Sequence, residues 1–135
     1  MDTINKKMKT KGKPDARKKG RAKKAAYAVK GRLWIEGKSG TFIGFGRVVL
    51  LERIKRYGSI TNAAKSMKIS YRHAWELVDS MNSQSKTPLV KTATGGKSGG
   101  GAKLTETGHA AIVEFWTLYK KLARFLEREN ANLKF

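Results

Sequence analysis

Residues 58–82 read GSITNAAKSMKISYRHAWELVDSMN, and this stretch identifies the architecture of the chain. Ser59 is a good helix-capping residue, and it precedes a short helix that the sequence predicts over Ile60–Met67. Lys68-Ile69 is predicted to form a tight turn. Ser70 then caps a second helix that continues to the end of the stretch. Two helices joined in this way indicate a helix-turn-helix, which presents its second helix to DNA.

The second helix has one apolar face. Because such a helix buries one face, we expect these side chains, Trp75 included, to pack in the core rather than to stack on bases. The first turn, residues 70–73, then stays free to enter a DNA major groove, which is about 12 Å wide. Its unpaired N–H groups also favour a phosphate. The apolar residues recur at helical spacing and are Ala74, Trp75, Val78 and Met81.

Candidate DNA contacts follow from this placement. Arg72 suits bidentate hydrogen bonds to guanine O6 and N7, with a phosphate clamp as the alternative role. For Tyr71 three roles stay open: stacking on a base, touching a thymine methyl group, or covering the core. The other candidate contacts in the two helices are Ser59, Lys68, Ser70 and His73.

The residues before this stretch predict a hairpin and a further helix. Residues 32–45, RLWIEGKSGTFIGF, read as two short strands joined by a glycine-containing loop. Gly46–Tyr57 carries Val48, Leu51 and Ile54 at helical spacing, so it is predicted to be a helix. Gly58 ends that helix, as glycine commonly does.

A second hairpin is predicted after residue 82. Two short strands, Pro88–Thr92 and Ala102–Leu104, flank the glycine-rich residues 93–101. A hairpin that follows a helix-turn-helix is a wing. Its glycines allow a close approach to a sugar-phosphate backbone, and Lys91 adds charge. The candidate wing contacts are Thr94, Lys97, Ser98 and Lys103.

The last predicted helix is long, from Glu106 to about Asn130, with Thr105 as its cap. It carries more apolar residues than one packed face needs. The excess suggests a helix–helix dimer interface, and the alternative is a helix that is more buried in its own chain. The apolar positions are Ala111, Ile112, Phe115, Trp116, Leu118, Tyr119, Leu122, Phe125 and Leu126.

Charge is concentrated at the N-terminus. Residues 1–32 hold 13 Lys or Arg side chains against two Asp, a net +11 out of +20 for all 135 residues. We expect a disordered lysine-rich tail over residues 1–31, because too little apolar surface is present to offset chain entropy. Arg17–Val29 is the part expected to become helical on a polyanion, and a solvated solubility tail is the alternative. Residues 32–130 then form the folded domain.

Several other classes of protein are not supported. The chain has no cysteine, no run of about 18 apolar residues and no secretory signal, so we expect a cytoplasmic, nucleoid-associated protein without a membrane segment. The GGKSGGG loop lacks phosphate-loop spacing, because Lys91 stands where glycine is required. His73 and His109 lie in no metal-ligand cluster. No nucleophile–base pair is visible, so we expect no enzyme, no cofactor and no metal.

The sequence resembles a known family. Gly58-Ser59-Ile60 with Ala63-Ala64 is shared with LysR-type regulators. A more specific combination resembles the N-terminal winged helix-turn-helix domain of ModE-type, molybdate-responsive transcriptional regulators, over roughly residues 32–128. That combination comprises Ser70-Tyr71-Arg72, Ala74-Trp75, Met81-Asn82, Thr94-Gly95-Gly96, Gly99-Gly100-Gly101 and Leu104-Thr105.

The resemblance implies a homodimer, formed through the long helices, that binds a palindromic operator in double-stranded DNA. We therefore expect a mostly α fold with a small β component: a winged helix-turn-helix with a long C-terminal dimerisation helix and a basic tail. The expected function is sequence-specific regulation of transcription, in a short form lacking the molybdate-binding domain. Molybdate-related genes are the targets that the resemblance suggests. A weakly specific architectural DNA-binding protein is the main alternative, and RNA binding is a third.

Overall fold

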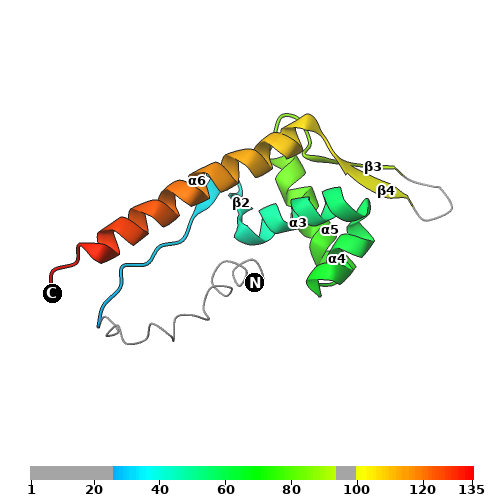
Figure 1. Ribbon diagram of the computed structural model, residues 1–135. Helices are drawn as coiled ribbons and strands as arrows, with labels where there is room; N and C mark the ends of the chain where they lie inside the picture. Colours follow the sequence, from blue (N-terminus) through cyan, green and yellow to red (C-terminus); the bar gives the residue numbers. More distant parts are fainter. Residues whose placement is uncertain (1–25, 94–99) are drawn as a thin grey trace. The chain divides into compact units, whose positions relative to one another are not determined.

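The computed structural model describes residues 26–93 and 100–135 (Figure 1). Residues 1–25, which include most of the predicted tail, and residues 94–99 of the predicted wing loop lie outside this range. The described chain divides into two units. Residues 33–121 form the main unit, and residues 26–32 with 122–135 form the terminal unit.

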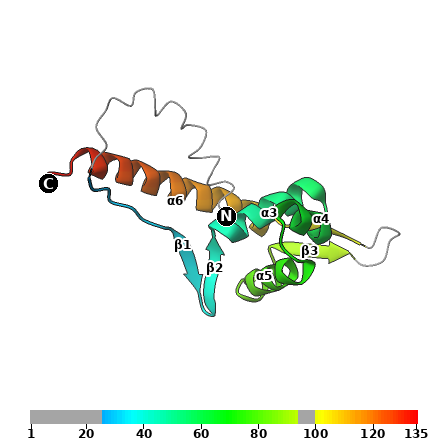
Figure 2. The ribbon, with the colours of Figure 1, turned by 90° about the horizontal axis from the view of Figure 1, so that it is seen from below.

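The main unit begins with the predicted hairpin, β1 (Trp34–Gly37) and β2 (Gly40–Gly44). The strands are antiparallel (Figure 2), with a bulge where the pairing shifts between Ile35 and Glu36. Gly40, with a φ of 107°, occupies backbone space that other residues avoid, which explains a glycine at this turn.

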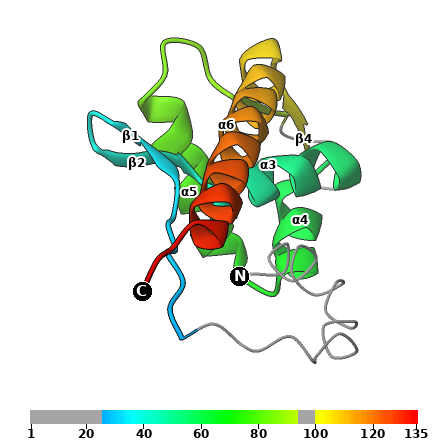
Figure 3. The ribbon, with the colours of Figure 1, turned by 60° about the vertical axis from the view of Figure 1, so that its left-hand side comes forward.

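Three helices follow, and they pack against one another (Figures 1 and 3). They are α3 (Phe45–Tyr57), α4 (Ile60–Met67) and α5 (Tyr71–Ser83). α4 packs through Ala63 and Ala64, small side chains that allow its neighbours to come close. The larger side chains buried in the main unit include Ile43, Val48, Leu50, Leu51, Ile54, Met81, Leu89 and Phe115.

The predicted ends of these helices are confirmed. Gly58 adopts a left-handed conformation, and its N–H donates to the Ile54 carbonyl at 2.8 Å. The Ser59 hydroxyl accepts from the Asn62 N–H and the Ser70 hydroxyl from the His73 N–H, both at 3.0 Å. These caps set the two helices of the helix-turn-helix at the predicted positions.

The predicted wing is confirmed as an antiparallel hairpin of β3 (Val90–Ala93) and β4 (Gly101–Leu104). The Ala102 N–H donates to the Gly58 carbonyl at 2.9 Å, so the wing is tied to the C-terminal end of α3. A Cβ atom at residue 101 would lie 3.2 Å from that same carbonyl oxygen, a tight contact that glycine avoids.

The long helix α6 (Glu106–Ala131) contributes residues 106–121 to the main unit. Its predicted cap is confirmed, because the Thr105 hydroxyl accepts from the Gly108 N–H at 3.0 Å. Phe115 is fully buried beside Trp116 and Tyr119, and both of these rings also lie within 6 Å of Phe45 on α3. This aromatic cluster docks the first half of α6 on α3.

The terminal unit pairs the end of α6 with the residues that precede the main unit. The backbone of Val29 exchanges two hydrogen bonds with the Asn130 side chain, at 2.7 and 3.1 Å. The rings of Tyr27 and Phe135 lie 5.3 Å apart. Residues 26–29 are not helical, and the rest of the stretch Arg17–Val29 lies outside the described residues. The last residues assigned to the tail thus make defined contacts.

Candidate nucleic-acid interface

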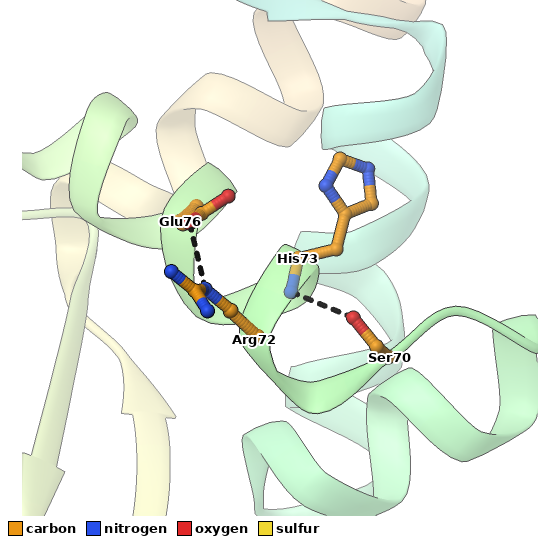
Figure 4. Close-up of polar contacts among 4 residues, drawn as sticks. All are labelled: Ser70, Arg72, His73 and Glu76. Atoms are coloured by element: carbon orange, nitrogen blue, oxygen red, sulfur yellow. Dashed lines mark hydrogen bonds and ion pairs between the residues drawn. The ribbon is translucent and has the colours of Figure 1, made fainter.

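The first turn of α5 is open to solvent at the place where the sequence predicts the DNA contacts. Tyr71, Arg72 and His73 are exposed. Figure 4 shows the hydrogen bond in which the Ser70 hydroxyl accepts from the His73 N–H. The N–H groups of Tyr71 and Arg72 belong to the first helical turn, which has no carbonyl partners within the helix. This end of α5 can therefore receive a phosphate while its side chains project outward.

Arg72 forms an ion pair on the outer face of α5 (Figure 4). Its Nε lies 3.2 Å from Oε2 of Glu76, one helical turn later. Because both side chains are largely exposed, the pair adds little stability. Its effect is geometric: within the described chain the two terminal nitrogens of Arg72 have no hydrogen-bond partner. The fork that matches guanine O6 and N7 is left available.

Trp75 corrects a prediction. The sequence places it in the core, but its side chain is 45 % exposed. The core contacts of α5 run through Ala74, Val78 and Met81, and Trp75 stands about 100° around the helix from Ala74, outside that narrow stripe. Tyr71 is 53 % exposed, so part of its ring is open to contact DNA and part is covered by the protein. Sequence periodicity failed here because it cannot show how wide a face the neighbouring helices cover.

The remaining candidate residues lie in the turn between α4 and α5, at the start of α4 and in the wing. Lys68 is exposed in the turn between α4 and α5, where its φ of 58° makes the turn sharp. Ser59 is half-buried and serves as a cap. Lys103 on β4 is exposed and lies directly opposite the exposed Lys91 on β3. Like charges across a strand pair repel, so a phosphate between them would relieve the repulsion. Thr94, Lys97 and Ser98 lie outside the described residues.

Two residues that are not among the candidate DNA contacts, Arg47 and Asn82, hold α5 against its neighbours. Arg47 of α3 donates through Nη1 to the Thr41 carbonyl at 2.7 Å and to the Ser80 hydroxyl at 3.0 Å. Desolvation by burial lowers the pKa of Arg47, which nevertheless remains protonated at physiological pH. Asn82, two residues after Ser80, joins this same C-terminal end of α5 to the start of the wing. Its Oδ1 accepts from the N–H groups of Leu89 and Val90, and its Nδ2 donates to the Val90 carbonyl.

Replacing Asn82 with Ala should destabilise the fold by about 1–3 kcal/mol, because the partly buried N–H groups of Leu89 and Val90 would lose their acceptor. Urea denaturation measures this loss, and amide hydrogen exchange at residues 89 and 90 should accelerate. Asn62→Ala is the matched control, because the Asn62 side chain is exposed on α4, and its effect should stay within about 0.5 kcal/mol. Equal stability of the two variants would contradict the role given to Asn82.

Two other kinds of feature, a metal-binding cluster and a membrane-spanning helix, are not found among the described residues. These residues contain no group of three or more His, Cys, Asp or Glu side chains placed to hold a metal ion. None of the helices in the described ranges is long and apolar enough to cross a membrane. His73 and His109 are both exposed, on different helices. Exposed large apolar side chains lie on α5 and also elsewhere, including Trp34 on β1 and Val113 and Phe125 on α6.

Comparisons with known proteins agree with this geometry. Residues 45–109 match the family described as bacterial regulatory helix-turn-helix protein, lysR family. The chain is 36 % identical over 102 residues to the molybdenum transport protein ModE of Azotobacter vinelandii, covering 76 % of this chain and 38 % of that protein. It is 42 % identical over 84 residues to the molybdenum-pterin-binding protein MopA of Rhodobacter capsulatus, covering 62 % of this chain and 32 % of that protein.

A third relative is the DNA-binding transcriptional dual regulator ModE of Escherichia coli K12, at 44 % identity over 82 residues, covering 61 % of this chain and 30 % of that protein. The matches span about a third of the length of these relatives. The residues matched by the family model include the helix-turn-helix and the wing hairpin. Residues 45–109 therefore resemble a bacterial regulatory helix-turn-helix domain of the lysR family, and the chain is similar to ModE-type regulators.

Proposed function

We propose that this protein is a sequence-specific DNA-binding transcriptional regulator that places α5 in the major groove. The observation that carries the proposal is the outer face of α5, where Arg72 is exposed and held by Glu76 with its terminal nitrogens available. The proposal involves no catalysis and no cofactor.

The other contacts follow from the same docking. Arg72 reads guanine, His73 lies at the groove, and the caps of α4 and α5 place Ser59 and Ser70 near phosphates. Lys68 in the turn and the Lys91–Lys103 pair in the wing contact the backbone, and this fixes the register without reading sequence. The wing loop extends this contact through Thr94, Lys97 and Ser98.

The targets that we propose are molybdate-related genes, and the site of action is the nucleoid in the cytoplasm. The support is the similarity to relatives that are named as molybdenum transport and molybdenum-pterin-binding proteins and as transcriptional regulators. The similarity covers the part of those relatives that includes the helix-turn-helix. The DNA fragments that the protein binds in a genomic selection would identify these genes.

We propose that the protein acts as a homodimer through α6. In the terminal unit Phe125 is 46 % exposed, with the Arg128 guanidinium 5.7 Å from its ring centre. A two-fold dimer reads two half-sites about 34 Å, one helical turn, apart or a multiple of that distance. Sedimentation equilibrium should give twice the chain mass of 15.0 kDa, and a monomer at micromolar concentration would exclude this arrangement.

We propose that the lysine-rich tail, residues 1–31, adds phosphate contacts to those of the domain formed by residues 32–130. Deleting residues 1–25, which hold 11 Lys or Arg side chains, leaves the hydrogen bonds of Val29 in place. The slope of log affinity against log salt should become shallower by up to about 0.9 for each phosphate that the tail no longer neutralises. Base preference should not change. An unchanged slope would show that the tail does not touch DNA.

The experiment that tests the proposed function is selection of genomic DNA fragments on the purified protein at about 0.15 M salt, where the Debye length is about 8 Å. A shared inverted repeat among the recovered fragments is the expected result, and the neighbouring genes then identify the regulated process. Fragments without a common motif would overturn the proposal.

The second candidate is an architectural, weakly specific DNA-binding protein, which the net charge of +20 favours. Charge alone attracts any duplex and supplies most of non-specific binding. The two candidates differ in the ratio of specific to non-specific affinity, which exceeds about a thousandfold only for a regulator.

A further inference from the structure

Two large aromatic side chains stand exposed one turn apart on α5. Tyr71 and Trp75 are 53 % and 45 % exposed, and their spacing of four residues places them side by side on the helix surface. Leaving a tryptophan in water forgoes the apolar burial that such a side chain could provide. An exposed aromatic pair on a helix therefore suggests a surface that is completed by something else.

Trp75 differs from the other two tryptophans in the hydrogen bonding of its indole N–H. The indole N–H of Trp34 donates to Glu36, and that of Trp116 donates to Glu52, both at 2.9 Å. Within the described chain, the N–H of Trp75 has no acceptor. Trp75 thus presents an apolar ring and an unused donor together.

The neighbours of this pair show what kind of partner fits. Arg72 and Glu76 follow Tyr71 and Trp75 directly in sequence, so each lies about 100° further around the helix. The outer face of α5 therefore has a charged half and an aromatic half, side by side. Because the charged half is the proposed base-reading surface, the aromatic half adjoins the same groove.

Thymine is the base whose major-groove edge matches the aromatic half. That edge carries one acceptor, O4, next to the C5-methyl group, which is the distinctive apolar group of the major groove. The unused indole N–H of Trp75 can donate to O4, while the aromatic surface covers the methyl group. No other base offers an acceptor beside a methyl group.

We propose that Trp75, with Tyr71, forms a thymine-reading site that takes the C5-methyl group of an operator thymine. The inference rests on the proposed function and extends it, because it assigns a specificity-determining role to a residue whose sequence context predicts core packing. It also adds thymine to the guanine that Arg72 reads, so each half-site contains both bases within the reach of one helix.

The test replaces operator thymines one at a time with deoxyuridine, which removes the methyl group and leaves O4. The probe is the fragment obtained by the genomic selection, and dissociation constants are measured for the full chain and for Trp75→Ala. One such replacement should weaken binding of the unchanged protein about fourfold, the effect of one buried methyl group. The same replacement should have no effect on Trp75→Ala.

Two further variants serve as controls. Trp34→Ala removes a similarly exposed tryptophan from β1 and should respond to deoxyuridine as the unchanged protein does. Trp75→Phe keeps an apolar ring but not the N–H, so it should retain a response to the methyl group with a lower affinity. Circular dichroism should show the same helix content in every variant, because Trp75 contributes little to the core.

Several results would overturn the inference. Equal deoxyuridine effects on the unchanged protein and on Trp75→Ala would show that the methyl group lies elsewhere. A loss in Trp75→Ala that is equal on operator and random DNA, or a change in its sedimentation mass, would place Trp75 against a second copy or another segment of the chain. If the selection yields no operator, the proposed function and this inference both fail. If it yields an operator but deoxyuridine weakens binding equally with and without Trp75, only the inference fails.

Discussion

Arg72→Ala should weaken binding to the selected operator by about 5- to 150-fold, which corresponds to the roughly 1–3 kcal/mol of one bidentate base contact. The ion pair with Glu76 uses only Nε of Arg72, so the alanine variant loses the whole fork that faces the base. Binding to random DNA should change far less, since only one of many positive charges is removed. Titration of labelled operator and random duplexes at a fixed salt concentration measures both quantities.

Two companion variants separate base reading from a phosphate clamp at this position. Arg72→Lys keeps the charge but not the planar fork, so it should behave nearly as poorly as Arg72→Ala on the operator. Arg56→Ala removes an exposed arginine from the last turn of α3 and should leave operator preference intact. If Arg72→Lys restored operator binding, and if the loss in Arg72→Ala were equal on random DNA, Arg72 would be a phosphate clamp.

Phe115→Ala should lower the free energy of unfolding by about 3–5 kcal/mol, a cost typical of deleting a fully buried aromatic ring. Its ring lies 5.4 Å from that of Trp116 and 6.0 Å from that of Tyr119, in the cluster that docks α6 on α3. Because domains are stable by only about 5–15 kcal/mol, this single change should shift urea and thermal unfolding strongly.

Val113→Ala on the same helix is the matched control. The Val113 side chain is 65 % exposed, so its removal should change the unfolding free energy by no more than about 0.5 kcal/mol. A loss below about 1 kcal/mol in Phe115→Ala would contradict the docking described for α6. In that case the fold would depend mainly on the small core of α3, α4 and α5.

The parts of the fold that the sequence predicts well are those set by local hydrogen bonds. Ser59, Ser70 and Thr105 each accept from an N–H three residues later, so the capping pattern is visible in a few letters. Gly58 is also predicted to end α3, because glycine adopts the left-handed conformation of a helix end without a steric penalty. The two hairpins follow from glycine placement and short apolar runs.

Long-range packing explains what the sequence could not predict. Trp75 matches a helical apolar stripe, yet its neighbours cover only the narrower strip around Ala74 and Val78. Asn82 is part of the family resemblance, but the sequence does not show that its side chain makes three hydrogen bonds to Leu89 and Val90. The same holds for Arg47, whose partners on β2 and α5 are brought together only by the fold.

If the outer face of α5 reads DNA sequence, the protein must distinguish its operator from other DNA of the same charge. The dissociation constant for the selected operator is compared with that for a scrambled duplex of equal length and composition, at about 0.15 M salt. We predict a ratio above about a thousandfold, as for specific regulators. A ratio near one would contradict sequence reading by α5 and would leave the charge of the chain as the whole basis of its affinity for DNA.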